Sequence, residues 1–267
     1  MEDRTGKLIE SVGQPVEVPF ADYSISPDGS RVAFTAGRSS SDIWVTPFAS
    51  GIATRLTFTG GNYAHWSSDG KHVFYDYGRS IYKRAADGSG AEELLAKGDF
   101  VTSVSPDGEH LLFGRNHIFM LPLGGEKKAV PYLQTKFNEG GAVFSPDGRW
   151  VAYSSDESGR SEVYIQGFPE RRGKWQVSAE GGTFPQWRAD GKELYWTGND
   201  QRTLMAAPIE LKAAGVKAGR TELLFRAPNF AVPSRDGKRF LVMNPEGGEQ
   251  PNLPMVVVQH WAAGLPK

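Results

Sequence analysis

The chain has 267 residues, 39% of them hydrophobic and 23% charged, and its formal net charge is −1. A nearly neutral chain exerts no general attraction on nucleic acid, so no nucleic-acid partner is expected. The absence of cysteine excludes disulfides, thiolate metal sites and a cysteine nucleophile. No apolar run reaches the roughly 20 residues of a membrane-spanning helix, so no membrane insertion is expected.

The sequence leaves the cellular compartment open. Residues 1–4 are charged and lack the apolar core of a signal peptide. As written, the sequence is that of a cytoplasmic protein. It is equally compatible with an extracytoplasmic domain excised from a larger bacterial protein.

The first predicted strand covers residues 6–13 and precedes a series of repeats. Six times along the chain, an apolar strand runs into a turn of the Ser-Pro-Asp-Gly type and out into a second apolar strand. The glycines of these turns follow one another at intervals of 38 to 46 residues. This period, built from short strands, is typical of a β-propeller with one blade per repeat. The turn glycines are Gly29, Gly70, Gly108, Gly148, Gly191 and Gly237.

Each repeat is expected to contain four strands. In the fourth repeat, for example, one strand ends at Phe144 and the others cover 151–153, 162–165 and 175–177, all rich in β-branched and aromatic residues. The stretch 211–214 is helix-like but very short. The blades are expected to begin near residues 21, 62, 100, 140, 183 and 229.

The sixth repeat has three expected strands, the third at 255–258, and no fourth strand before the chain ends. Residues 6–13 resemble the fourth strands of earlier repeats, so we expect them to complete the last blade. The sequence therefore predicts an all-β, six-bladed β-propeller of four-stranded antiparallel blades, closed by its N-terminal strand. We expect a single domain over residues 1–267 and a monomer.

The aspartates that precede the turn glycines invite a metal-site interpretation, but Asp and Gly are also the residues that tight turns require. We interpret them as turn formers. Asp22 is the only carboxylate within five residues before any of these turns. A hard cation needs several oxygen ligands, so neither a metal nor a cofactor is expected. The Gly-x-Ser-x-Gly, Walker and His-x-x-x-His patterns are also absent.

His65 falls in an innermost strand, two residues before the turn serine. An imidazole near the axis could bind a ligand or be a satisfied channel histidine, and the second interpretation is favoured because the sequence offers no orienting partner. The equivalent residues in the other repeats are Ser24, Ser103, Val143, Gln186 and Val232.

The face that carries the connections between blades should be rich in aromatic, arginine and asparagine side chains. This composition is typical of recognition surfaces. The alternative is that these aromatic residues only fill the blade interfaces. The predicted ligand-binding residues on this face and at the channel mouth are Asp22, Tyr23, Tyr63, His65, Phe137, Asn138, Arg160, Phe184, Gln186 and Phe230.

The repeats resemble the TolB-like β-propeller family, whose signature is an aromatic residue followed by Ser-Pro-Asp-Gly-Lys/Arg, as in residues 144–149. The chain is most similar to the propeller at the C-terminus of bacterial eukaryotic-like Ser/Thr protein kinases. That resemblance implies an attached sensory or interaction domain without an assigned reaction. The sequence departs from the pattern in two short loops, 77–79 and 114–116. The resemblance is carried by residues 3–7, 133–139, 144–150, 155–160, 173–178 and 260–265.

Two functions from different classes follow. The first is a non-catalytic β-propeller that binds a protein, a peptide or a small ligand on its loop-rich face or channel mouth. The second is a lactonase-like propeller hydrolase or lyase with a site near His65.

Overall fold

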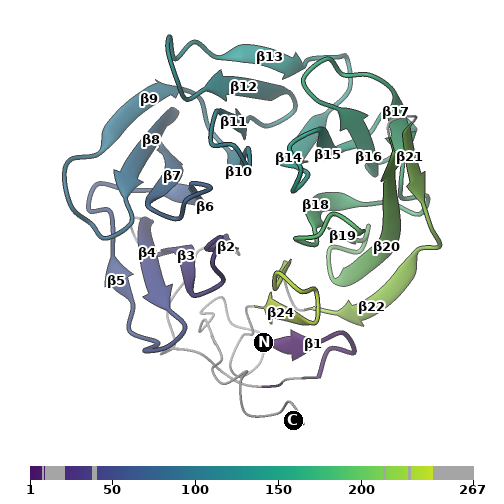
Figure 1. The fold of residues 1–267 in the computed structure, drawn as a ribbon, viewed down its shortest axis with the longest axis horizontal. Helices are drawn as coiled ribbons and strands as arrows, with labels where there is room; N and C mark the ends of the chain where they lie inside the picture. The colour runs from purple at the N-terminus through teal and green to yellow at the C-terminus, as the bar shows by residue number, and fades with distance from the viewer. Residues whose placement is uncertain (8, 10–21, 38–40, 213–214, 228–229, 243–267) are drawn as a thin grey trace.

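The computed structural model describes all residues except 8, 10–21, 38–40, 213–214, 228–229 and 243–267. Its strands form six sheets arranged around a central axis (Figure 1). The predicted six-bladed β-propeller is confirmed. The part of the chain that the structure describes contains no helix, and hence none that could cross a membrane.

Each of the first four blades is a sheet of four antiparallel strands, which run in chain order from the axis outward. Blade 1 contains β2 (Tyr23–Ile25), β3 (Arg31–Ala36), β4 (Asp42–Pro47) and β5 (Thr54–Arg55). Blade 2 contains β6 (Asn62–Trp66), β7 (His72–Tyr77), β8 (Ser80–Ala85) and β9 (Glu93–Lys97). Blade 3 contains β10 (Val101–Val104), β11 (His110–Phe113), β12 (Ile118–Pro122) and β13 (Val130–Leu133). Blade 4 contains β14 (Glu139–Phe144), β15 (Trp150–Ser155), β16 (Glu162–Gly167) and β17 (Lys174–Gln176).

Blade 5 has a longer third strand than the other blades. Its first part, residues 203–206, pairs with residues 222–226 and completes a four-stranded blade, and its last part, residues 209–212, pairs with a fifth strand, with Ile209 opposite Ala218. Residues 211–212, which looked helix-like in the sequence, therefore belong to a strand. The strands are β18 (Thr183–Trp187), β19 (Glu193–Thr197), β20 (Thr203–Lys212), β21 (Gly215–Ala218) and β22 (Glu222–Arg226).

An N-terminal strand joins the last blade, as predicted. Sheet 6 consists of β23 (Ala231–Pro233), β24 (Arg239–Val242) and β1 (Glu2–Asp3), with Glu2 opposite Phe240. The closing strand over 6–13 stays a prediction, because residues 8 and 10–13 lie outside the described residues. The described residues that pair with β24 are 2–3. They occupy the place beside β24 that the sequence analysis assigned to 255–258, a segment that lies outside the described residues.

A tight turn after β1 leads the chain back along this strand. The Asp3 carboxylate accepts hydrogen bonds from the backbone N–H groups of Thr5, at 2.8 Å, and Lys7, at 3.1 Å. Gly6 has a φ of 78°, and a Cβ atom there would lie 2.7 Å from the Cβ of Phe225. The chain folds back after the turn, and the N–H of Ile9 bonds to the carbonyl of Met1 at 2.9 Å. The N-terminus therefore enters the blade as a hairpin.

The Ser-Pro-Asp-Gly turns form as their sequence predicts. In the first turn the Ser26 hydroxyl donates to Asp28 at 2.5 Å, the N–H of Ser30 donates to Asp28 at 3.0 Å, and Gly29 has a φ of 74°. The hydrogen bonds lower the pKa of Asp28 to about 2. The turn aspartates are thus occupied by local backbone and serine groups.

Apolar side chains of adjacent blades pack against one another around the ring. Between blades 1 and 2, for example, Ile43 and Val45 pack with Trp66, Val73 and Tyr75 in one buried cluster. Because each blade is buried on both faces by its neighbours, the ring must close to avoid exposing two such faces.

A hydrogen-bonded ion pair links the N-terminal hairpin to blade 5. The guanidinium of Arg4 donates to both carboxylate oxygens of buried Glu193, at 2.8 and 3.0 Å, and Glu193 also accepts from Arg188 and from the hydroxyl of Tyr195. Burial raises the pKa of Glu193, but the hydrogen bonds and charges of these partners outweigh burial and lower it below its usual value. This contact joins the N-terminal hairpin in blade 6 to blade 5, beside the point where the ring closes.

Replacing Arg4 by Met should weaken the closure. The change removes charge-assisted hydrogen bonds to a buried carboxylate, so the free energy of unfolding should fall by about 1 to 3 kcal/mol at pH 7. Because the pKa of Glu193 is lowered in the folded protein, the difference should shrink in acid as Glu193 becomes protonated. Urea denaturation at pH 7 and pH 3 measures both effects, and the exposed Arg172→Met serves as control. Equal stability of Arg4→Met and wild type would contradict the closure role.

Candidate functional site

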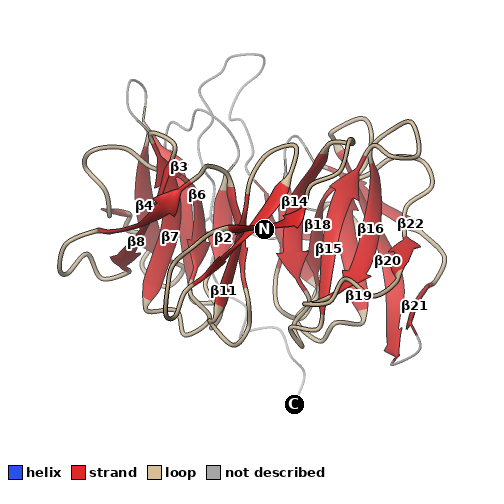
Figure 2. Cartoon of the chain, turned by 90° about the horizontal axis from the view of Figure 1, so that it is seen from above, coloured by secondary structure: helices blue, strands red, loops and turns tan. Residues whose placement is uncertain are grey.

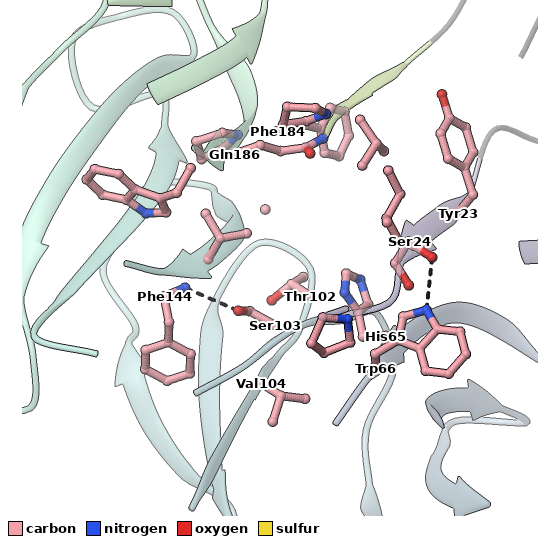
Figure 3. A pocket seen from close by; sticks show the side chains of 18 of the residues that line it. Tyr23, Ser24, His65, Trp66, Thr102, Ser103, Val104, Phe144, Phe184 and Gln186 are labelled. Carbon is pink, nitrogen blue, oxygen red and sulfur yellow. Dashed lines mark hydrogen bonds between the residues drawn. The ribbon is translucent and has the colours of Figure 1, made fainter. Parts of the chain in front are cut away.

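A cavity of about 730 Å³ lies on the axis of the ring. The six inner strands β2, β6, β10, β14, β18 and β23 supply its wall, and Figure 3 shows their side chains around the open space. Its lining includes aromatic residues at the loop-rich end and prolines of the Asp-Gly turns, such as Pro27 and Pro106, at the other. The cavity therefore extends from one face of the propeller to the other.

A β-bulge interrupts the pairing of the inner strand in blades 2 to 5. A residue with a positive φ lies in or directly before each bulge: 53° at Tyr63, 62° at Phe100, which precedes its bulge, 62° at Gly141 and 51° at Phe184. Such a backbone conformation is uncommon for a bulky residue and costs of order 1 to 3 kcal/mol. Bulges re-aim side chains, and here they occur where the cavity meets the loop-rich face.

We call the five aromatic residues at this end of the cavity the aromatic rim: Tyr23, Tyr63, Phe100, Phe184 and Phe230. Ring centroids are 4.0 Å apart for Tyr63 and Phe100, 5.8 Å for Phe184 and Phe230, and 5.9 Å for Tyr23 and Phe230. The rim thus forms two groups of packed rings, one on blades 2 and 3 and one on blades 5, 6 and 1.

Buried carboxyl groups hold two of the rim residues in their left-handed conformation. Asp22 of blade 1 accepts hydrogen bonds from the Thr35 hydroxyl at 2.7 Å and from the N–H of Tyr63 in blade 2. Asp76 of blade 2 accepts from the N–H of Phe100 in blade 3 at 3.1 Å. Each carboxyl therefore ties a left-handed rim residue to the preceding blade.

Burial determines the acidity of these two carboxyl groups. It raises the pKa of Asp22 to about 6, against the opposing effect of the hydrogen bonds from Thr35 and Tyr63. It raises the pKa of Asp76 to about 7, where the hydrogen bond from Phe100 opposes the shift and the charge of Asp22 adds to it. Their negative charge is thus reduced near neutral pH.

His65 differs from the other residues at its level of the wall. Ser24 donates to the carbonyl of Ala64 at 2.7 Å, Ser103 accepts from the N–H of Phe144 at 3.2 Å, and Gln186 donates to the carbonyl of Ala231 at 3.3 Å. Within the described residues, no hydrogen bond holds the His65 ring. Burial lowers its pKa to about 4, so the imidazole is neutral at pH 7. It can donate one hydrogen bond to a molecule in the channel and accept one from it.

Seven of the ten predicted site residues line the cavity, and three do not. Among the three, Asn138 is held by Asp156, with N–Oδ1 and Nδ2–Oδ2 distances of 2.9 and 2.6 Å. Arg160 donates to Glu162 at 2.7 Å, and Phe137 lies under the ammonium of Lys136. The seven that line the cavity are Asp22, Tyr23, Tyr63, His65, Phe184, Gln186 and Phe230.

The structure adds residues that the sequence prediction omitted. Phe100 lies five residues before its turn serine, whereas Tyr63 and Phe184 lie four residues before their turns, so counting back from the turns does not align it with them although all three have a positive φ. Arg115 lies over the Phe100 ring, with its guanidinium carbon 4.3 Å from the ring centroid. Its Nη2 donates to the hydroxyl of Tyr63 at 3.3 Å. No local pattern predicts this contact, because it crosses from blade 3 to blade 2.

One group of side chains has a spacing compatible with a metal ion, but it is not part of this site. Among the described residues, ligand atoms of Asp107, Glu109 and His110 all lie within 4.8 Å of one another on the turn face. Asp107 already accepts hydrogen bonds from Ser105 and from the N–H of Glu109, as turn aspartates do. We therefore assign no metal to it.

Replacing Asp22 by Asn should flatten the pH dependence of stability. The raised pKa means that the protonated carboxyl stabilises the fold below about pH 4 and that this contribution is lost as the pH rises through about 6. Relative to Asp22→Asn, the free energy of unfolding of the wild type should fall by about 2 to 3 kcal/mol between pH 4 and pH 7. Urea titrations across this range measure it. The exposed Glu126→Gln should follow the wild type, and parallel curves for Asp22→Asn and wild type would refute the assignment.

Comparison with known proteins supports the fold. No family model matches the chain, and no curated protein sequence matches it. TolB from Acinetobacter baumannii superposes with a TM-score of 0.64 at 16% identity over 82% of this chain, which spans only 59% of that protein. A putative TolB from Agrobacterium tumefaciens gives 0.63 at 19% identity, covering 84% of this chain and 88% of the other. Oligogalacturonate lyase from Vibrio parahaemolyticus gives 0.57 at 11% identity, covering 92% and 90%. The chain is thus similar in structure to TolB-like six-bladed propellers.

Proposed function

We propose that this propeller is a non-catalytic binding module that captures a peptide segment at the aromatic rim and the adjoining channel. The observation that carries the proposal is the set of three aromatic residues held at positive φ around one mouth of the cavity: Tyr63, Phe100 and Phe184. Strained backbone of this kind clusters at functional sites. Aromatic anchors in a concave site also supply most of the energy of many interfaces.

The rim has accessible apolar surface for a partner. Phe184 is 40% exposed although it is large and hydrophobic. The wall below it offers neutral polar groups, including Ser103, Gln186 and the neutral imidazole of His65. An apolar mouth above a few polar groups is the usual composition of a ligand site.

A lactonase-like hydrolase or lyase with its site near His65 is the second candidate. It is favoured by the neutral imidazole that lacks a described hydrogen-bond partner, and propeller enzymes such as oligogalacturonate lyase are among the similar structures. A general base is normally oriented by a further group. Because no described carboxylate bonds to His65, the binding module is the better supported function.

The resemblance to the propeller of bacterial Ser/Thr protein kinases provides one biological setting for the proposed binding function. In that setting the chain is the sensory domain of a larger protein, and occupancy of the channel is the signal. A protein partner is a second setting, since the similar structures include two TolB proteins. Each setting uses the same mouth of the channel.

Replacing Tyr63 and Phe184 together by Ala should abolish peptide capture. Truncation of a central aromatic anchor often costs about 2 kcal/mol, so each change should weaken binding roughly thirtyfold. The probe is a fluorescent ten-residue peptide selected on the wild type from a random library, and fluorescence polarisation gives the dissociation constant.

The matched control is Phe58→Ala, which removes an aromatic side chain that is 66% exposed and is not part of the cavity lining. It should leave binding unchanged, and melting temperatures verify that every variant is folded. Turnover of an ester or lactone by the wild type, lost about 100-fold in His65→Ala, would instead support the enzyme.

A further inference from the structure

Arg115 is an exposed guanidinium at the channel mouth that no sequence pattern assigned to the site. It belongs to the short connection between β11 and β12, where Gly114 has a φ of 116° and Asn116 a φ of 70°. A Cβ atom at Gly114 would lie 2.4 Å from the carbonyl oxygen of His117. The backbone thus passes too close to itself for any other residue, and the loop holds Arg115 over the mouth.

The guanidinium is positioned by the aromatic rim. It lies 4.3 Å from the centroid of the Phe100 ring and donates one hydrogen bond, from Nη2, to the Tyr63 hydroxyl at 3.3 Å. Both residues are themselves fixed, because Asp22 and Asp76 bind their backbone N–H groups. An arginine that stacks on an aromatic face loses less freedom when it binds a further group.

Most of the donors of Arg115 remain available to a partner. Guanidinium has five N–H donors, and the Tyr63 hydroxyl uses one of them. Within the described residues, no carboxylate lies within ion-pair distance of Arg115, whereas arginines such as Arg55, Arg160 and Arg188 each have one. A planar fork without an acid partner is suited to bind a carboxylate with two parallel hydrogen bonds.

We propose that the channel mouth selects peptides that carry an acidic side chain, and that Arg115 binds its carboxylate while the aromatic rim holds the neighbouring apolar residue. This inference rests on the proposed function, since it names the chemistry of the peptide captured at the same mouth. Arg115 is then a specificity-determining residue, and Tyr63 and Phe100 are the platform that orients it.

Because of the other charged groups at this mouth, the binding of acidic peptides should depend on pH. The groups that act on Tyr63 and Asp76 are Arg115 itself and the carboxyls of Asp22, Asp76 and Asp99. Burial raises the pKa of Asp22 to about 6 and that of Asp76 to about 7, so both lose charge in mild acid. An acidic peptide should therefore bind more tightly at pH 5.5 than at pH 8, while an uncharged peptide should change less.

A peptide array tests the inference with the intact chain. The array carries random ten-residue peptides, each printed a second time with its Glu and Asp residues replaced by Gln and Asn. The wild type should bind the acidic member of a pair about tenfold more tightly, as expected for a charge-assisted bidentate contact. Arg115→Gln should bind both members alike, and Arg115→Lys should keep only part of the preference. Arg79→Gln, which changes the arginine of the corresponding short loop in blade 2, should keep all of it.

The outcomes separate this inference from the proposed function. If the wild type captures peptides in a manner that depends on Tyr63 and Phe184 but binds acidic and amide members equally, the role of Arg115 is wrong and the binding module stands. A preference for basic peptides, or an acidic preference that survives in Arg115→Gln, also overturns it. If no peptide is captured at all, both proposals fail. Melting temperatures of the variants exclude a loss of fold.

Discussion

The left-handed residues near the start of the inner strands in blades 2 to 5 are the constraint on which the channel mouth depends. A regular strand would alternate its side chains between the two faces of the blade, whereas the left-handed backbone at Tyr63, Phe100 and Phe184 brings their rings to the mouth. Tyr63 and Phe100 keep this conformation because carboxyls of the preceding blades bind their N–H groups. Burying those carboxyls without a cationic partner is costly, and their raised pKa values are the sign of that cost. A function of the rim would account for the backbone strain at Tyr63 and Phe100 and for the burial of Asp22 and Asp76.

Closure of the ring keeps these parts in register. Every blade packs on two neighbours, so the relative position of the six inner strands is fixed only when the last blade is complete. The N-terminal hairpin holds the last blade in place through two contacts. β1 pairs with β24, and Arg4 forms an ion pair with Glu193 in blade 5. The ion pair thus helps to position the rim residue Phe230, because it holds blade 6 against blade 5.

The sequence predicted those features that arise from local chemistry. Asp28 and Gly29 favour a tight turn through their own side-chain and backbone chemistry. The regular spacing of such turns along the chain predicts the repeat and the propeller. The pairing of residues 2–3 with β24 was not predicted, because it depends on the turn that Asp3 makes with Thr5 and Lys7. Arg115 was missed because its hydrogen-bond partner Tyr63 belongs to a neighbouring blade. Asn138 was placed with the site from composition, although its nearby partner Asp156 occupies it.

The central proposal is that a peptide binds at the aromatic rim. Photo-crosslinking measures this directly, with p-benzoylphenylalanine introduced at Phe184 in one preparation and at Phe58 in another. A fluorescent peptide selected on the wild type should crosslink at position 184 and not at position 58, and unlabelled peptide should compete. Crosslinking at position 58 alone, or at both positions equally and without competition, would contradict the claim.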